Sequence, residues 1–169
     1  MKIAVLGFSG SGKSTLAKQF SEYYHIPLLY LDCINFEENW KLRDRDICRK
    51  LTAEFMQNES WVIDGNYSGF YQAERLAEAD KIIILQYNRF VCMKGAFKRN
   101  TEYKGKVRES MADGCFERMD MWFFLWVVFN QYSGKRKRHY KKIKKTYPDK
   151  TVIFKSRKQL RLYLDSVLK

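Results

Sequence analysis

Short apolar runs alternate with stretches of helical periodicity along most of this chain. The short apolar runs lie at residues 2–6, 27–31, 60–64, 81–85 and 151–154. The fourth run is apolar without alternation, as is typical of a strand that is buried on both faces. Helical patterns occur at about 14–24, 44–57, 70–79 and 156–167. This alternation predicts an α/β fold in which a parallel sheet of five strands carries helices on both faces.

The connection between the fourth and fifth predicted strands is far longer than the others. It covers about residues 88–147, with a helix expected over 88–103, a turn rich in glycine and charge near 104–114, and further helices over 116–147. Connections in compact domains usually have only about four to six residues. We therefore expect one domain over residues 1–169, with this helical insert as its lid.

The composition agrees with a single folded domain. The chain has 169 residues, of which 46% are hydrophobic and 16% aromatic, so a disordered chain is excluded. The longest apolar run, 121–129, is shorter than the roughly 20 residues that cross a bilayer. The first strand begins at the N-terminus with no leader, so we expect a cytoplasmic protein with no membrane partner. The run at 121–129 could pack in the core or lid or form a dimer contact, so monomer and homodimer both stay open.

Charge is spread unevenly along the chain. The net charge is +13, with 9 basic and 12 acidic residues in 1–80 and 23 basic and 7 acidic residues in 81–169. Such asymmetry points to an anionic partner for the second half, either nucleotide phosphates or a nucleic acid.

Residues 7–15 form a complete G-x-x-x-x-G-K-[ST] phosphate-binding loop between a predicted strand and a predicted helix. Its members are Gly7, Phe8, Ser9, Gly10, Ser11, Gly12, Lys13, Ser14 and Thr15. Glycines let backbone N–H groups turn towards an anion, and the start of the helix adds positive potential. Lys13 is expected to reach the β- and γ-phosphates, and the Ser14 hydroxyl to bind Mg²⁺. The sequence therefore predicts that ATP and Mg²⁺ are bound here.

Polar residues follow the other predicted strands, at the edge of the sheet where open α/β folds bind ligands. Asp64 ends the third strand, where its carboxylate can face Mg²⁺. Asp32 ends the second strand, where it suits accepting a proton from a hydroxyl nucleophile. A turn role for Asp64 and a capping or turn role for Asp32 are the alternatives.

The insert carries basic residues on both sides of its glycine-rich turn: Lys98, Arg99, Lys104, Lys106, Arg108 and Arg118. Lids of this kind close over a triphosphate and place guanidinium groups on the charge that develops during transfer. We expect Arg99 and Arg108 to act in this way, although a solvated helix face would explain any one of the six. Further along, a run of basic side chains without an acid reads Lys135, Arg136, Lys137, Arg138, Lys141, Lys142 and Lys144. It suits either polyanion binding or a solvated lid surface.

Several of these motifs together resemble the bacterial DNA topology modulation proteins, which are similar to adenylate and shikimate kinases. The motifs are the phosphate-binding loop, Leu31-Asp32, Trp61 to Tyr67 (WVIDGNY), Asn88-Arg89-Phe90 and Gly114-Cys115. The resemblance implies a three-layer P-loop kinase fold with strand order 2-3-1-4-5, and binding of ATP and Mg²⁺. Adenylate kinases continue Asp-Gly-Phe-Pro-Arg after the third strand, whereas Asn66-Tyr67-Ser68 stands here, which argues against AMP as acceptor.

Two functional hypotheses follow. The first is a kinase that moves the γ-phosphoryl group of ATP to a small-molecule hydroxyl or a nucleoside or nucleotide acceptor, with Asn66, Tyr67 and Arg89 in the acceptor pocket. The second is an ATP-binding regulator that affects DNA topology through its basic second half.

Overall fold

The computed structural model describes residues 1–117, 125, 127, 129, 132 and 134–168. Its main sheet contains five parallel strands in the order β2-β5-β1-β6-β7. The strands are β1 (Lys2–Gly7), β2 (Leu28–Tyr30), β5 (Trp61–Asp64), β6 (Lys81–Leu85) and β7 (Thr151–Phe154). The five-stranded parallel sheet and its expected order are therefore confirmed.

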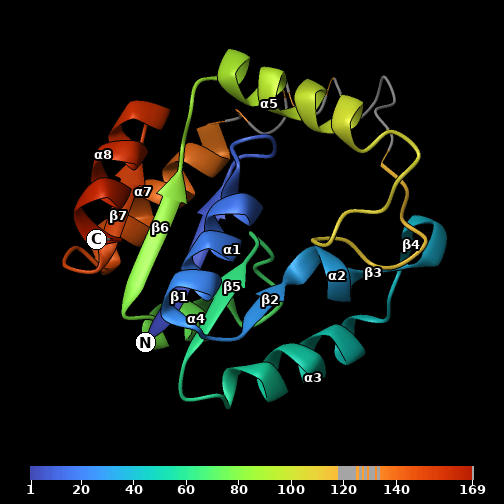
Figure 1. Ribbon diagram of the computed structural model, residues 1–169. Helices are drawn as coiled ribbons and strands as arrows, with labels where there is room; N and C mark the ends of the chain where they lie inside the picture. The colour runs from blue at the N-terminus through green and yellow to red at the C-terminus, as the bar shows by residue number, and fades with distance from the viewer. Residues whose placement is uncertain (118–124, 126, 128, 130–131, 133, 169) are drawn as a thin grey trace.

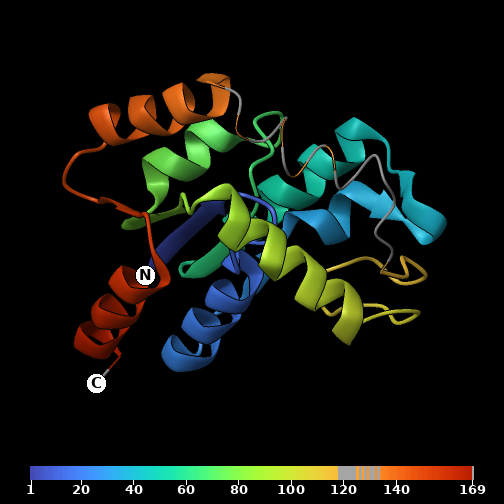
Figure 2. The ribbon, with the colours of Figure 1, turned by 90° about the horizontal axis from the view of Figure 1, so that it is seen from above.

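Helices cover both faces of this sheet, which gives three layers. Figure 2 shows α1 and α8 on one face and α4 and α7 on the other. The helices around the sheet are α1 (Lys13–Tyr24), α3 (Arg45–Met56), α4 (Gln72–Glu78), α5 (Arg89–Glu102), α7 (Gly134–Thr146) and α8 (Arg157–Val167). The middle strands β1, β5 and β6 are buried almost throughout, because both of their faces are covered.

Polar side chains fix several helix starts. Asp44 accepts the N–H groups of Asp46 and Ile47 at the start of α3, and Asn88 accepts the N–H of Phe90 at the start of α5. Since each cap satisfies donors that the helix itself leaves free, both helices begin within a residue or two of the expected position.

Asp32 was expected at the end of the second strand, and this is wrong. The strand ends at Tyr30, and the chain turns directly into α2 (Leu31–Asn35), where Asp32 lies in the first turn. A small antiparallel ribbon follows, made of β3 (Phe36–Glu37), η1 (Glu38–Trp40) and β4 (Lys41–Leu42). Elements of two to five residues are too short to carry a periodic signal. We call residues 31–42 the arm.

The lid begins with α5 and returns as an extended segment, residues 103–117. Phe116 and Glu117 were expected to start a helix, but they form isolated bridges with Val107 and Lys104 instead. Figure 1 shows this segment running from the end of α5 to the tip of the arm. Arg118 and most of the apolar run 121–129 lie outside the described residues. Within the described parts of the chain, no helix is long and apolar enough to cross a membrane.

Candidate active site

The phosphate-binding loop connects β1 to α1 at the carboxyl edge of the sheet. Gly10 and Gly12 have φ values of 77° and 91°, in the left-handed region that only glycine enters at little cost. Gly12 caps α1 without any side chain, so the first N–H groups of the helix face the loop. No carboxylate of the described residues pairs with the Lys13 ammonium. The loop therefore has the cradle that a phosphate chain requires.

Helix α5 lies directly on this loop. A Cβ added at Gly95 would overlap the carbonyl oxygen of Gly10, and a Cβ added at Gly10 would overlap the carbonyl oxygen of Cys92. The two backbones thus meet where neither residue can carry a side chain. This contact fixes the direction in which α5 leaves the loop towards Arg99.

Asp64 and Ser14 form the candidate magnesium site. The Ser14 hydroxyl donates to Asp64 Oδ2 over 2.6 Å, while Asp64 Oδ1 is buried with no hydrogen-bond partner in the described structure. Burial raises the pKa of Asp64, and the nearby Lys13 ammonium and the Ser14 hydroxyl lower it in part. A buried carboxylate oxygen without a donor beside a hydroxyl is a donor set that suits Mg²⁺. The described residues contain no group of three or more potential ligands, so such an ion would complete its shell with phosphate oxygens and water.

The Asn66 side chain supports the loop from the next strand. Its amide nitrogen donates to the Gly7 carbonyl over 2.6 Å, and its amide oxygen accepts the Gly7 N–H over 3.2 Å. The Tyr140 hydroxyl donates to the same oxygen over 3.1 Å. Asn66 therefore holds the end of β1 in place, and it also lines the cavity in which it was expected to contact the acceptor.

Asp32 and Tyr67 meet on the opposite side of the site. The Tyr67 hydroxyl donates to Asp32 Oδ1 over 2.6 Å. Burial and the negative charge of Asp32 raise the pKa of Tyr67, so the phenol stays protonated and remains a donor. Among the described residues, no other donor reaches this carboxylate. Asp32 thus keeps its second oxygen for another partner.

The two lid arginines converge on one buried acid that the sequence analysis missed. Arg99 Nε donates to Glu117 Oε1 over 2.8 Å, and Arg108 Nε donates to Glu117 Oε2 over 2.6 Å. Only 2% of the Glu117 side chain is exposed, against 21% and 11% for the two arginines. Each guanidinium is held through Nε, and Arg108 Nη1 also donates to the Ser110 hydroxyl over 3.1 Å. A single glutamate in an irregular, charged segment carries no signal that would distinguish it from its exposed neighbours.

A cavity of about 780 Å³ joins these groups. Seven of the site residues predicted from the sequence line this cavity: Ser9, Lys13, Asp32, Asn66, Tyr67, Arg99 and Arg108. The arm contributes an apolar wall through Phe36, Trp40 and Leu42, and the lid contributes Met111. Phosphate-binding, acceptor-side and lid residues thus face one space.

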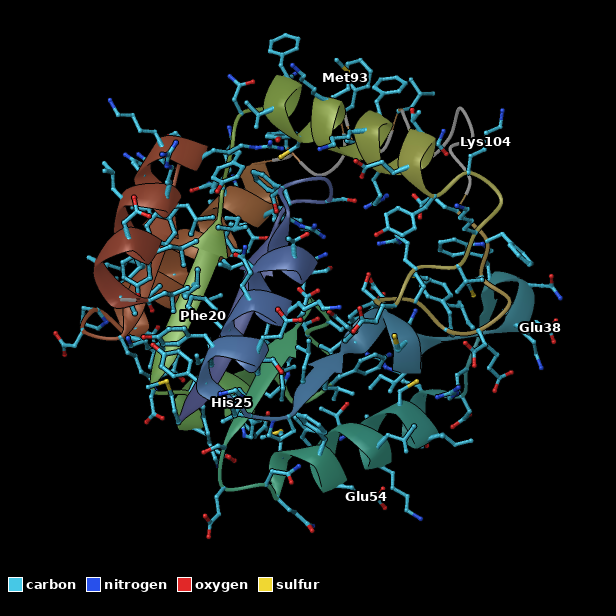
Figure 3. All side chains as sticks on the ribbon, viewed as in Figure 1. Phe20, His25, Glu38, Glu54, Met93 and Lys104 are labelled. Atoms are coloured by element: carbon cyan, nitrogen blue, oxygen red, sulfur yellow. The ribbon has the colours of Figure 1, made fainter. Side chains whose placement is uncertain are left out.

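The lid is attached to the arm by side chains that donate to main-chain carbonyls. Trp40 Nε1 donates to the Phe116 carbonyl over 3.0 Å, and Cys115 Sγ donates to the Glu37 carbonyl over 3.1 Å. Figure 3 shows Glu38 of the arm at the same edge of the molecule as Lys104 of the lid. The arm and the returning lid segment therefore close one side of the cavity together.

A second buried residue that the sequence analysis missed supports the loop after β5. Arg75 is fully buried, and it donates to the carbonyls of Phe70 and Tyr67, each over 2.8 Å. Burial lowers its pKa to about 10. Arg75 therefore fixes the backbone that positions the Tyr67 phenol against Asp32.

Arg89 is not brought to the cavity. It is the first residue of α5, and its guanidinium lies over the Tyr132 ring at 5.5 Å from the centroid. Arg99 follows ten residues later, which is about 15 Å further along the helix. The same helix therefore carries Arg99 over the cavity and leaves Arg89 at the opposite end.

The sequence matches no known family model and no curated protein. Similarity is found among solved structures. A shikimate kinase from Bacteroides thetaiotaomicron superposes with a TM-score of 0.60 at 18% identity, covering 99% of this chain and 96% of that one. This chain has a shikimate kinase-like fold. An uncharacterized protein from Eubacterium ventriosum gives a TM-score of 0.53 at 17% identity, covering 98% of both chains.

These neighbours place the chain among proteins with a P-loop kinase fold, and at such low identity they show the fold alone. None of the comparisons shows the DNA topology modulation family that the sequence motifs resemble. That resemblance stays a prediction.

Proposed function

We propose that this protein is an ATP-dependent kinase that transfers the γ-phosphoryl group to a hydroxyl of a small acceptor. The observation that carries the proposal is the single cavity lined by Lys13, Asp32, Arg99 and Arg108. It combines a phosphate cradle, a carboxylate and two guanidinium groups, which are the parts that phosphoryl transfer needs.

The phosphate side of the reaction belongs to the loop. Lys13 and the loop N–H groups bind the phosphates of ATP, with Ser14 and Asp64 as the groups that would hold Mg²⁺. When bound, that ion neutralises charge on the phosphate oxygens. Arg99 and Arg108 stabilise the charge that develops during transfer, because they are held in a partly dry site where such interactions are strong.

The acceptor side belongs to Asp32. The hydroxyl oxygen of the acceptor forms the new bond to the γ-phosphorus, the bond to the ADP oxygen breaks, and the hydroxyl proton passes to Asp32. Tyr67 holds one carboxylate oxygen, which leaves the other for the hydroxyl. A phosphate acceptor next to Asp32 would be repelled, which favours a hydroxyl.

The test is ATP consumption with a panel of nucleosides, nucleotides, sugars and hydroxy acids. We expect at least one acceptor to be phosphorylated, Lys13→Met to abolish the reaction, and Asp32→Asn to lower the rate by about 100-fold or more while ATP binding is kept. Phosphorylation that is unchanged in Asp32→Asn would remove Asp32 from the mechanism. A calorimetric titration that finds no binding of ATP·Mg²⁺ would remove the whole proposal.

A second candidate function is an ATP-binding regulator that contacts DNA. The observation in its favour is α7, which carries eight Lys or Arg residues and no acid. Non-specific binding through this helix should weaken steeply with salt. Arg138→Glu combined with Lys141→Glu should abolish it, since both side chains are exposed and neither lines the cavity. No DNA binding at low ionic strength would rule this function out.

A further inference from the structure

Helix α7 carries basic side chains along its whole length. Eight of its 13 residues are Lys or Arg, and none is acidic. Seven of these side chains are exposed, and we call them the basic face: Lys135, Lys137, Arg138, Lys141, Lys142, Lys144 and Lys145. Tyr140 and Ile143 are the buried residues of the helix. One side of α7 thus packs on the protein, while the basic face meets the solvent.

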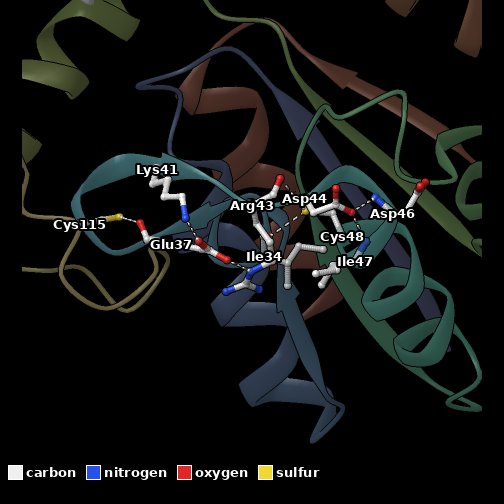
Figure 4. A network of polar contacts seen from close by, with 9 residues as sticks. All are labelled: Ile34, Glu37, Lys41, Arg43, Asp44, Asp46, Ile47, Cys48 and Cys115. Atoms are coloured by element: carbon white, nitrogen blue, oxygen red, sulfur yellow. Dashed lines mark hydrogen bonds and ion pairs between the residues drawn. The ribbon is translucent and has the colours of Figure 1, made fainter.

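The protein does not balance the charge of the basic face. In the arm, by contrast, Glu37 lies 3.3 Å from Lys41 and 3.6 Å from Arg43 (Figure 4). Among the described residues, no carboxylate pairs with any of the seven side chains. Like charges four residues apart, such as Arg138 and Lys142, repel on a helix, and a first turn with basic side chains and no acid opposes the helix dipole. An anion that covers this face would therefore stabilise the folded helix.

The chemistry of the basic face fits the phosphate backbone of a nucleic acid. A helix of 13 residues is about 20 Å long, so its charges match a row of phosphates. Basic side chains contact such a backbone without reading the bases. A membrane surface would require exposed apolar side chains beside the charges, whereas Tyr140 and Ile143 are buried.

The inner side of α7 contacts the phosphate-binding loop. The Tyr140 ring packs against Phe8 of the loop, with 5.7 Å between the centroids, and its hydroxyl donates to Asn66 Oδ1 over 3.1 Å. The same oxygen accepts the Gly7 N–H over 3.2 Å. Tyr140 thus reaches the first two residues of the loop, Phe8 directly and Gly7 through Asn66.

A second contact between α7 and Asn66 lies beside the first. His139 Nε2 is 2.9 Å from Gln72 Oε1, and Gln72 Nε2 donates to the Asn66 carbonyl over 3.2 Å. Arg136, one turn earlier on α7, lines the main cavity. The helix that carries the basic face is therefore part of the support of the nucleotide site.

We propose that the basic face of α7 binds the phosphate backbone of a nucleic acid, and that Tyr140 and Asn66 couple this binding to ATP binding at the loop. The two states are α7 with Tyr140 bonded to Asn66, and α7 released from Asn66. A nucleic acid favours the bonded state because it offsets the repulsion within the basic face. ATP favours the same state because the loop is then held in place. Each ligand therefore raises the affinity of the other by the same factor.

This coupling goes beyond phosphoryl transfer, and it requires of the proposed function only that the loop binds ATP. It is tested first without nucleotide, by hydrogen exchange at the Gly7 N–H with a short DNA duplex of mixed sequence at low ionic strength. We expect the duplex to slow this exchange about fivefold, in line with one stabilised hydrogen bond.

Tyr140→Phe should remove this protection, because it keeps the ring against Phe8 and loses the hydroxyl. Tyr163→Phe is the matched control, since its ring packs against Phe154 on α8, and it should follow the wild type. Absence of protection in the wild type, or equal protection in Tyr140→Phe, would overturn the coupling.

Calorimetry then measures the affinity for ATP·Mg²⁺ with and without the duplex. We expect the duplex to tighten ATP binding about fivefold, ATP to tighten duplex binding equally, and Tyr140→Phe to remove both effects. An ATP affinity that the duplex lowers or leaves unchanged would overturn the coupling. If ATP·Mg²⁺ does not bind at all, the kinase function fails, and the exchange at Gly7 still decides whether α7 acts on the loop.

Arg138→Gln combined with Lys142→Gln tests the surface itself. We expect affinity for the duplex to fall about tenfold or more, with a shallower salt dependence. Lys158→Gln combined with Arg161→Gln removes the same charge from the exposed side of α8, on the other face of the sheet (Figure 2), and should leave binding unchanged. Equal losses in the two double variants would show a general charge effect and overturn the basic face as the site. Inorganic polyphosphate that binds more tightly than the duplex at equal phosphate concentration would overturn the nucleic acid as its partner.

Discussion

Arg99 and Glu117 form a buried ion pair of 2.8 Å, and the same carboxylate binds Arg108 through its other oxygen. Glu117 therefore sets the spacing of the two guanidinium groups that face the phosphate-binding loop. Removing its charge would leave two arginines close together without a shared anion. Burial and the neighbouring Arg108 lower the pKa of Arg99, and the charge of Glu117 opposes this shift.

We expect Glu117→Gln to destabilise the protein by roughly 3–5 kcal/mol, because breaking a buried pair leaves uncompensated charge. The phosphoryl-transfer rate should fall about 100-fold, since both arginines lose their orientation. Chemical denaturation and steady-state kinetics measure the two effects. Glu109→Gln is the control: Glu109 pairs with Lys18 at the surface, so stability and rate should hardly change. Similar losses in both variants would contradict the central role of Glu117.

Tyr67→Phe should separate orientation of Asp32 from binding of ATP. The change removes the 2.6 Å hydrogen bond to Asp32 and leaves the ring in place against Phe70. We expect kcat/KM for the acceptor to fall about tenfold, in line with a hydrogen bond to a charged group. The dissociation constant of ATP·Mg²⁺, measured by calorimetry, should stay the same. Weaker ATP binding at an unchanged transfer rate would show that Tyr67 serves the phosphate side.

Asp64→Asn should stabilise the ligand-free protein at neutral pH. Because burial raises the pKa of Asp64 in the folded state, folding favours the protonated carboxyl. This contribution is fully present below the unfolded pKa of about 4, and it is lost as the pH rises through the folded pKa. The wild type should therefore lose stability with rising pH relative to Asp64→Asn, as followed by denaturation midpoints from pH 4 to pH 8.

The same variant should lose the Mg²⁺ dependence of nucleotide binding. Asp165→Asn, on the exposed side of α8, is the control and should follow the wild type in both measurements. Parallel pH profiles for the wild type and Asp64→Asn would contradict the assigned pKa direction.

Gly95→Ala tests the contact between α5 and the phosphate-binding loop. The new Cβ would overlap the Gly10 carbonyl oxygen, and backbone atoms on both sides leave little freedom to adjust. We expect a loss of roughly 1–3 kcal/mol in the free energy of unfolding and weaker ATP binding. Gly134→Ala is the matched control, because its Cβ would meet only the flexible end of Arg138, at 3.1 Å. A fully stable Gly95→Ala that binds ATP normally would show that the contact is not required.

The sequence predicted those parts of the site that are encoded locally. The phosphate-binding loop is one continuous motif, and Asp64 follows a strongly apolar strand. Arg99 and Arg108 stood out as basic residues around a glycine-rich turn. In each case the signal lies within a few residues of the functional group, so strand and helix patterns suffice to place it.

Other parts of the site depend on contacts between distant segments. The Asp32–Tyr67 bond joins residues 35 positions apart, and it forms because β2 and β5 are neighbours in the sheet. Glu117 becomes central only when the lid folds back beneath α5. The arm consists of elements too short for periodicity, so its wall of the cavity could not be foreseen.

Peptide carbonyls accept each of three hydrogen bonds between the lid and the arm: the Trp40 indole donates to Phe116, the Cys115 thiol to Glu37 and the Asn39 N–H to Gly114. Every amino acid supplies a carbonyl, so Phe116 and Glu37 can be exchanged without deleting these acceptors. Substitutions at such positions can change the side chains that line the cavity while the lid stays attached to the arm. Proteins with this fold could therefore change their substrate specificity and still keep the contacts between lid and arm.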